Sequence, residues 1–361
     1  MSPFLHSKAV KISGRSPSNL TSTTAPIICV IFPNILFSQI QNTSYNSLNT
    51  HSSSRVLSMG GDVISVFDND VSLAIFAPSL LNESMDKQIA FNFVDYLSDI
   101  NFISFHSAKK ISENLMLFTG IDAINYGEFN GTDVVGNSTA TFNSSQQIIT
   151  IGSSKRISNN FTFGANIKLL NSNLETYHAM TLSSNISATY FNQSSNLAST
   201  FLLKNIGKPI INYTSEKENL PFEIQLGVSK SLKHLPFRYS VVLHHLNQYD
   251  ISDDYNLNTI YDPITNTVQI KDETVAKKLL RHVIIGGELN PFRKSFYLRG
   301  GFNFQRREDL KLSSAFSMSG FSWGLGFSIK KVQINYSRSA FHTSSSLNSF
   351  SVITNLSNFG L

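Results

Sequence analysis

Strict alternation of apolar and polar residues is the feature that most constrains the fold of this chain. In residues 161–169, apolar side chains occupy every second position. The positions between them carry Thr162, Gly164, Asn166 and Lys168. The same period of two runs through residues 295–305 and 321–330. Successive side chains of a β-strand point to opposite faces, so each segment predicts a strand with one apolar and one polar face.

Segments of this kind follow one another from residue 88 to the C-terminus. We expect strands near residues 88–95, 99–109, 114–126, 145–156, 160–172, 180–192, 197–206, 221–233, 237–249, 282–291, 295–306, 320–330, 332–342 and 350–359. An even number of strands of about ten residues is typical of a transmembrane barrel, in which apolar side chains face lipid and polar ones face the lumen. The sequence therefore predicts an all-β, antiparallel transmembrane β-barrel of about 14 strands over residues 88–361.

Composition agrees with a membrane crossing made by strands. The chain has 361 residues, of which 15% are charged, and its mean hydropathy is −0.05. A helical membrane protein needs runs of about 18 or more apolar residues, and the sequence has none. A barrel crosses lipid with only every second residue apolar, which gives a near-neutral average. A soluble β-protein is disfavoured, because it would have to bury the apolar face that a barrel shows to lipid.

The N-terminal region has the parts of a secretory signal peptide. Basic residues precede a hydrophobic segment at residues 27–37, which Ser38 and Gln39 follow. We predict a signal peptide over residues 1–39, with export to the outer membrane. The chain has a single cysteine, Cys29, so an intramolecular disulfide framework is excluded. Cys29 lies in the hydrophobic segment and is better explained as an apolar residue of the signal peptide than as a lipidation site.

Residues between the signal peptide and the first strand differ from both. Residues 40–54 are rich in Asn, Ser and Thr and predict a flexible segment. Residues 55–87 contain turn-forming motifs and short apolar stretches, and they precede the first strand. We expect residues 55–87 to fold inside the lumen as a short plug. The candidate plug motif comprises Gly60, Gly61, Asp68, Asp70 and Pro78.

The connections between the expected strands are of two lengths. Some, such as residues 233–237 and 291–295, are short, whereas residues 127–144, 207–220 and 250–281 are long. Short turns at one rim and long loops at the other are the usual arrangement in such barrels. Within the longest connection, a run with acidic residues at its start and lysines near its end predicts a short helix.

No arrangement of residues indicates catalysis or cofactor binding. His244 and His245 are adjacent, and successive strand residues point to opposite faces, so we expect no shared metal ion there. We therefore predict no enzyme activity, no cofactor and no metal. The net charge is +5, but the basic residues are scattered rather than clustered, which disfavours nucleic acid as a partner.

Two further groups of residues are candidates for contacts outside the barrel. Arg306, Arg307, Glu308 and Asp309 form the densest charge cluster, near the end of an expected strand. It is either a solvated rim or a docking patch for a partner, since guanidinium groups bind carboxylates in a bidentate manner. The C-terminal residues of the last strand can carry the signal that barrel assembly recognises. The candidates for this signal are Phe359 and Leu361.

Several short motifs, taken in order, resemble the PorQ family, the type IX secretion system barrels of Bacteroidetes. The motifs are Met59-Gly60-Gly61-Asp62-Val63, Asp68–Asp70, Pro78-Ser79-Leu80-Leu81-Asn82, Ile124-Asn125-Tyr126-Gly127 followed by Phe129, Asn205-Ile206-Gly207-Lys208, Leu220-Pro221-Phe222-Glu223-Ile224-Gln225-Leu226-Gly227-Val228-Ser229-Lys230, Pro236-Phe237-Arg238, Leu280-Arg281-His282, Phe296-Tyr297-Leu298-Arg299, Asn303-Phe304-Gln305-Arg306-Arg307 and Gly320-Phe321-Ser322-Trp323-Gly324. One departure is Ala77, where the family usually has Asn before the proline. This departure weakens the expectation of a fixed polar contact there.

The resemblance implies a relative of the PorV and long-chain fatty-acid transporter barrels, with fourteen strands and a lumenal N-terminal segment. It also implies a non-catalytic anchor for a PorZ-like surface protein, which acts with PorU and PorV to attach secreted cargo to lipopolysaccharide in the outer-membrane lipid. The alternative is an outer-membrane transporter of hydrophobic compounds, similar to the fatty-acid barrels. That alternative requires an apolar pocket inside the lumen and a lateral opening in the wall.

Overall fold

The computed structural model describes residues 43–96, 99–132, 135, 137–215, 217–252, 259–262, 267–270, 273–292, 295–310, 318–340 and 346–360. All of them belong to one compact unit, Phe37–Leu361. The signal peptide predicted over residues 1–39 lies outside the described residues. Among those that are described, no helix combines the length and the hydropathy needed to cross a membrane.

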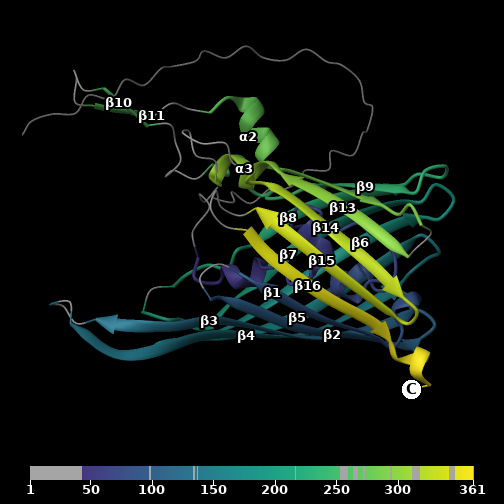
Figure 1. Ribbon diagram of the computed structural model, residues 1–361, viewed down its shortest axis with the longest axis horizontal. Coiled ribbons are helices and arrows are strands. Elements are labelled where there is room, and N and C mark those ends of the chain that lie inside the picture. The colour runs from purple at the N-terminus through teal and green to yellow at the C-terminus, as the bar shows by residue number, and fades with distance from the viewer. Residues whose placement is uncertain are drawn as a thin grey trace, which may run out of the picture. The chain divides into compact units, whose positions relative to one another are not determined.

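Fourteen strands close into a barrel, and each strand is antiparallel to both neighbours (Figure 1). Their order around the wall is β1-β16-β15-β14-β13-β12-β9-β8-β7-β6-β5-β4-β3-β2. Their bounds are β1 Gln88–Asp95, β2 Asn101–Ser112, β3 Leu115–Thr132, β4 Ser138–Arg156, β5 Phe161–Leu174, β6 Tyr177–Asn192, β7 Leu197–Ile211, β8 Glu223–Ser231, β9 Phe237–Leu243, β12 Val283–Leu289, β13 Phe296–Asn303, β14 Phe321–Ile329, β15 Val332–Ala340 and β16 Ser346–Asn355. The prediction of a barrel of about 14 strands is confirmed.

Alternation along the strands sorts side chains in the opposite sense to a soluble protein. In β5 the apolar residues are exposed, with Phe163 at 49% and Ile167 at 59%, whereas the polar residues between them are buried. Asn166 and Lys168 are each only 2% exposed. An apolar outer face and a polar inner face are what a barrel in lipid requires, because the solvent outside is hydrocarbon.

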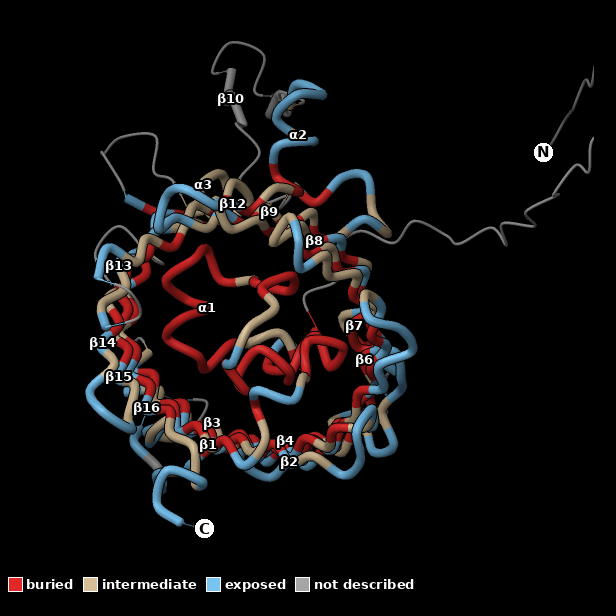
Figure 2. Tube along the Cα trace, turned by 90° about the vertical axis from the view of Figure 1, so that its right-hand side faces the viewer, coloured by how far each residue is buried: buried red, intermediate tan, exposed pale blue. Residues whose placement is uncertain are grey.

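The chain before β1 lies inside the ring of strands (Figure 2). It comprises five short helical elements joined by turns. They are η1 Asn46–Asn49, α1 Ser54–Ser58, η2 Val71–Ile75, η3 Pro78–Leu80 and η4 Glu83–Met85. Most of this chain is buried, and we call residues 43–87 the plug segment. The buried part includes residues 43–54, which the sequence predicted to be flexible. Within it, Tyr45 and Leu48 pack against inward apolar residues of the wall.

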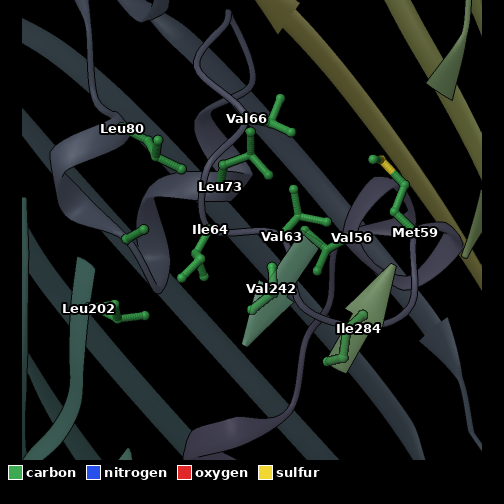
Figure 3. Close-up of a cluster of buried hydrophobic side chains, with 11 residues drawn as sticks. Val56, Met59, Val63, Ile64, Val66, Leu73, Leu80, Leu202, Val242 and Ile284 are labelled. Atoms are coloured by element: carbon green, nitrogen blue, oxygen red, sulfur yellow. The ribbon is translucent and has the colours of Figure 1, made fainter. Parts of the chain in front are cut away.

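Apolar side chains fill the space between the plug segment and one part of the wall. Val56, Met59 and Ile64 of the plug segment share a buried cluster with Leu202 of β7 and Ile284 of β12 (Figure 3). All five are at most 2% exposed. The lumen is therefore not wholly polar.

Glycines in the wall allow the backbone of the plug segment to approach closely. A Cβ atom on Gly301 would lie 2.2 Å from the backbone nitrogen of Gly60, and one on Gly164 would lie 2.3 Å from that of Ser79. Gly60 itself has a φ of +104°, a backbone conformation that residues other than glycine rarely adopt. These strand glycines fit the plug segment to the wall.

The two rims differ, but the long connection predicted at residues 127–144 is wrong, because β3 continues to Thr132 and β4 begins at Ser138; β7 likewise continues to Ile211. At the rim that carries the chain's C-terminus, the connections are short. The other rim carries long loops with α2 Val275–Arg281 and α3 Phe304–Leu310 (Figure 1). A small two-stranded sheet, β10 Thr259–Asp262 with β11 Thr267–Ile270, was not predicted.

Three predicted strands end at least three residues earlier than expected, each for a local reason. β13 stops at Asn303, whose side chain accepts a hydrogen bond from the backbone nitrogen of Arg306 and so caps α3. β16 stops at Asn355, whose side chain accepts from the backbone nitrogen of Ser357 at the start of the last 3₁₀ turn, η6 Leu356–Phe359. β9 stops at Leu243, two residues before a backbone with positive φ.

Candidate functional site

Charged side chains from the plug segment and the wall meet near the short-turn end of the lumen. We call the following residues the Arg55 cluster: Arg55, Asp68 and Asp70 of the plug segment, with Arg238 of β9, Glu288 of β12 and Arg299 of β13. The Arg55 guanidinium lies 2.6 Å from Asp68 Oδ2 and 3.0 Å from Glu288 Oε1. Asp68 Oδ2 also accepts from Arg238 at 2.6 Å, and Glu288 Oε2 accepts from Arg299 at 2.7 Å. The cluster ties the plug segment to three wall strands.

The two aspartates of the Arg55 cluster have opposite electrostatic environments. Burial raises the pKa of Asp68, but the charges and hydrogen bonds of Arg55 and Arg238 outweigh it and hold that pKa well below its usual range. Burial also raises the pKa of Asp70, and its 3.5 Å contact with Arg55 does not offset the rise. Asp68 therefore carries the principal ionic bond, whereas Asp70 mainly caps η2 through the backbone nitrogen of Ser72.

A cavity of about 550 Å³ opens beside the Arg55 cluster at the short-turn rim. Its charged lining includes Arg55, Asp68 and Arg299. Its apolar lining comes chiefly from the connection between β8 and β9 and from β13: Leu232, Leu235, Pro236, Phe237 and Tyr297. The volume lies within the range of small-molecule sites, and the lining is amphipathic.

A second group of titratable side chains lies nearer the long-loop end. We call it the Lys204 cluster: His51 and Asp62 of the plug segment, with Lys204, Glu223, His244 and His245 of the wall and its adjoining loop. His51 Nε2 lies 2.9 Å from Asp62 Oδ1, and Lys204 Nζ lies 3.8 Å from the same oxygen. Lys204 Nζ is also 3.5 Å from Glu223 Oε2. This cluster is a second ionic tie between plug segment and wall.

Electrostatics fix the charge states on the plug side of the Lys204 cluster. Burial raises the pKa of Asp62, but Lys204 and His51 outweigh it and hold that pKa well below its usual range. Burial lowers the pKa of His51, and its hydrogen bond to Asp62 does not restore it. His51 is therefore neutral and Asp62 ionised at neutral pH.

Inward polar side chains of the wall bind the main chain of the plug segment. Asn166 Nδ2 donates to the carbonyl of Ile75 at 2.7 Å, and Asn185 Nδ2 donates to that of Phe76 at 3.0 Å. Serines do the same elsewhere: the wall hydroxyls of Ser154, Ser229, Ser322 and Ser339 donate to plug carbonyls. The polar face of the strands satisfies backbone groups that helices this short leave unpaired.

The candidate plug motif divides between these contacts. Asp68 and Asp70 enter the Arg55 cluster, whereas Pro78 begins η3 and packs its main chain against Gly164. Gly60 and Gly61 form the turn after α1, where both have positive φ.

The charge cluster at residues 306–309 lies in α3 and makes internal contacts. A Cβ atom on Gly61 would lie 2.7 Å from Arg306 Nη2, so Arg306 reaches the plug segment. Asp309 pairs with the buried Arg281 of α2, which also binds Glu273 at 2.8 Å. Arg306 and Asp309 thus hold α3 to the plug segment and to α2. Arg307 and Glu308 are half-buried on the same helix.

Of the two C-terminal candidates, the structure describes Phe359, which is not in a strand. Phe359 lies in η6, where it is 54% exposed and Lys331 Nζ sits 5.0 Å from its ring centroid. Leu361 lies outside the described residues. Their proposed role in barrel assembly stays a prediction.

The expectation that His244 and His245 point to opposite faces is wrong. β9 ends at Leu243, and His245 has a φ of +54°, so strict alternation stops before the pair. The two Nδ1 atoms lie only 2.6 Å apart, beside Glu223.

Sequence reasoning did not identify Arg55, Lys204, Glu223 or Glu288 as members of a site. A signal for them was present, because alternation places each of the three wall residues on the inward, polar face of its strand. A charged side chain there needs a partner inside the lumen. Which partner it meets depends on the path of the plug segment, which alternation does not encode.

No protein-family profile matches this chain, and no curated protein does. Among solved structures, the chain is similar to the toluene transporter TodX of Pseudomonas putida, with 12% identity, coverage of 88% of this chain and 98% of that one, and a TM-score of 0.46. It is also similar to a FadL homologue of Pseudomonas aeruginosa, with 9% identity, coverage of 85% and 98%, and a TM-score of 0.47. Likenesses this low carry no argument about function. The strands and the filled lumen themselves define the class: a transmembrane β-barrel with an internal plug.

Proposed function

We propose that this protein is an outer-membrane barrel that admits a small hydrophobic or amphipathic compound and that its plug segment is the gate. The observation that carries the proposal is the cavity at the short-turn rim, whose floor is the Arg55 cluster. An apolar body fits against Leu235 and Phe237, and a polar head fits beside Arg238 and Arg299. A compound bound there touches both the plug segment and the wall.

The way in which the plug segment is held supports a gate. Buried ion pairs add little net stability compared with apolar packing, because both charges must be desolvated. Water that enters with a displaced plug segment would rehydrate Asp68 and Arg238, which lowers the free-energy difference between the closed and open states. The ion pairs of the Arg55 cluster can therefore break and re-form as the plug segment moves.

A reversible lock tests the proposal. Ser54 Oγ of the plug segment lies 2.7 Å from Ser349 Oγ of β16, so the pair S54C and S349C can form a disulfide. Uptake of radiolabelled toluene and decanoate is measured in a Gram-negative host that lacks its own channel for such compounds. We expect uptake above that of the empty host, loss of uptake in the oxidised double variant and recovery after reduction. S54C alone is the control. Uptake equal to that of the empty host would overturn the proposal.

A second candidate function is the anchor that the resemblance implies, in which the barrel holds a PorZ-like protein, with PorU and PorV, and retains cargo on the cell surface. The motifs that carry the resemblance support it, because they gather where the plug segment meets the wall. They supply Asp62 and Asp68 of the plug segment, and Arg238, Arg299 and Arg306 facing it. An anchor needs a fixed plug, and its docking surface would be the long-loop rim with α2 and α3.

The same locked variant separates the two candidates. An anchor keeps its function when the disulfide is oxidised, whereas a gated transporter loses it. For the anchor we expect a deletion strain to secrete cargo but retain little of it on the surface, and a PorZ-like protein to co-purify with the barrel in mild detergent. Normal retention in the deletion strain would exclude the anchor.

A further inference from the structure

Three side chains at the long-loop end of the wall direct their ligand atoms to one point. His244 Nδ1 and His245 Nδ1 are 2.6 Å apart. Glu223 Oε1 lies 3.4 Å from His245 Nδ1 and 3.9 Å from His244 Nδ1. We propose that these three residues bind one divalent transition-metal ion of the zinc type. Nothing in the transport or anchoring proposals requires this site, and it stands or falls independently of them.

Both the donor set and the geometry suit such an ion. Imidazole nitrogen and carboxylate oxygen are common ligands of Zn²⁺, and three protein ligands leave the fourth tetrahedral position to water. Ligand atoms about 2.0–2.1 Å from one tetrahedral ion lie about 3.3 Å from each other. The two Nδ1 atoms would separate by roughly 0.7 Å, and Glu223 would approach His244 by roughly 0.6 Å. Side-chain rotations are enough for changes of this size.

The local charge also favours a cation. Glu223 and Asp62 contribute two carboxylates. The ammonium group of Lys204 faces both, at 3.5 Å from Glu223 Oε2 and 3.8 Å from Asp62 Oδ1. Within the Lys204 cluster, two carboxylates thus meet a single ammonium group, in a place where Glu223 is only 2% exposed. An isolated buried charge is strongly unfavourable, and a bound cation removes it.

The surroundings orient the carboxylate and leave a path for the ion. Gln225 Nε2 donates to Glu223 Oε1 at 2.6 Å, and the backbone nitrogen of His245 donates to the same atom at 3.2 Å. Such outer contacts hold ligands in position for a metal. The His245 side chain is 23% exposed, whereas those of His244 and Glu223 are each 3% exposed. The ion would thus enter, and keep its water ligand, on the His245 side.

A metal here would join the start of β8 to the chain that leaves β9. Glu223 is the first residue of β8, and His244 follows the last residue of β9. Both positions lie at the rim where the long connection with α2 begins. The ion would fix the base of that loop to the wall.

The test is metal binding by the full mature chain in detergent micelles, purified without a histidine tag. Co²⁺ is the probe, because its visible absorption reports tetrahedral coordination, and Zn²⁺ is then added as the competitor. We expect one Co²⁺ per chain, displaced by Zn²⁺, and at least tenfold weaker binding in H245Q and in E223Q. H234A is the matched control, because His234 is exposed in the short turn between β8 and β9, and its binding should equal wild type.

Two outcomes would overturn the proposal. One is wild-type affinity no tighter than that of H245Q, and the other is equal loss in H234A, which would indicate nonspecific binding by surface histidines. Heat-modifiable mobility on a gel shows whether each variant folds. If either H245Q or E223Q does not fold, metal binding by the other variant tests the proposal. As an independent readout, Zn²⁺ should raise the unfolding temperature of wild type and H234A but not that of E223Q.

Discussion

Gly301 of β13 faces the backbone nitrogen of Gly60 so closely that a Cβ atom on Gly301 would lie 2.2 Å from it. Main chain therefore packs on main chain where the plug segment meets the wall. The neighbouring glycine, Gly300, has the opposite orientation, and a Cβ atom there would meet nothing nearer than 3.9 Å. Gly301 is thus required for the close approach of the plug segment, whereas the space beside Gly300 would accommodate a methyl group.

We expect G301A to destabilise the protein by about 3 kcal/mol, the upper part of the usual range for overpacking, because backbone atoms cannot move aside as a side chain can. G300A should change stability by less than about 1 kcal/mol, since its new methyl group meets open space. The urea midpoint of the unfolding transition, followed by heat-modifiable mobility, measures both. Equal midpoints for the two variants would contradict the close packing.

The two aspartates of the Arg55 cluster should respond differently to removal of their charge. D68N leaves Arg55 and Arg238 without their shared carboxylate, so we expect release of the plug segment to become easier by about 3 kcal/mol. D70N should cost less than about 1 kcal/mol, because asparagine also caps helices and the pKa of Asp70 is already raised by burial. Protease cleavage of residues 43–87 in folded barrels reports release. Similar cleavage rates in the two variants would argue against this assignment.

Protonation of His51 should loosen the plug segment in mildly acidic solution. Burial lowers the pKa of His51 in the seated state, whereas the released state has the ordinary value of about 6.5. The released state therefore binds the proton better, and the stability of the seated plug falls as pH drops below about 6.5, by up to about 1.4 kcal/mol per pH unit. The pKa of Asp68 is held low, so its contribution is lost only below about pH 4.

Hydrogen exchange of the backbone around His51, corrected for the intrinsic rate, measures this effect at pH 7.5, 6.5 and 5.5. Protection should decrease along this series in wild type. In H51Q, which cannot be protonated, it should stay constant. The same decrease in both proteins would assign the pH dependence to another group.

The outer face of β5 should not tolerate charge at its centre. Ile167 is 59% exposed in the middle of the strand, and Ile157 is 60% exposed in the turn before it. We expect I167K to destabilise the barrel in lipid by about 2–4 kcal/mol, whereas I157K, near the interface, should change stability by about 0–1 kcal/mol. Refolding yield in lipid vesicles distinguishes the two. Equal yields would mean that this face does not contact hydrocarbon.

Alternation was sufficient to predict the barrel because the side-chain period of a strand is local information. The period of two places Lys168 and Arg299 on the inward face of their strands, and both are buried there. It failed at His244 and His245, since the positive φ of His245 is set by the loop that follows rather than by strand propensity. The partners of Arg55 were equally inaccessible, because Asp68 and Glu288 are brought to it by the folded path of the plug segment.

The wall is built from strands of very different length, with 18 residues in β3 and 19 in β4 but only seven in each of β9 and β12. A bilayer crossing needs only about 9–11 residues of tilted strand. The hairpin of β3 and β4 therefore has about eight residues beyond the hydrocarbon, which is roughly 26 Å of strand at the usual rise per residue and roughly 20 Å in height at a tilt of about 45°. The wall is therefore uneven at the long-loop rim: the hairpin of β3 and β4 stands beyond the hydrocarbon, whereas β9 and β12 end close to its edge.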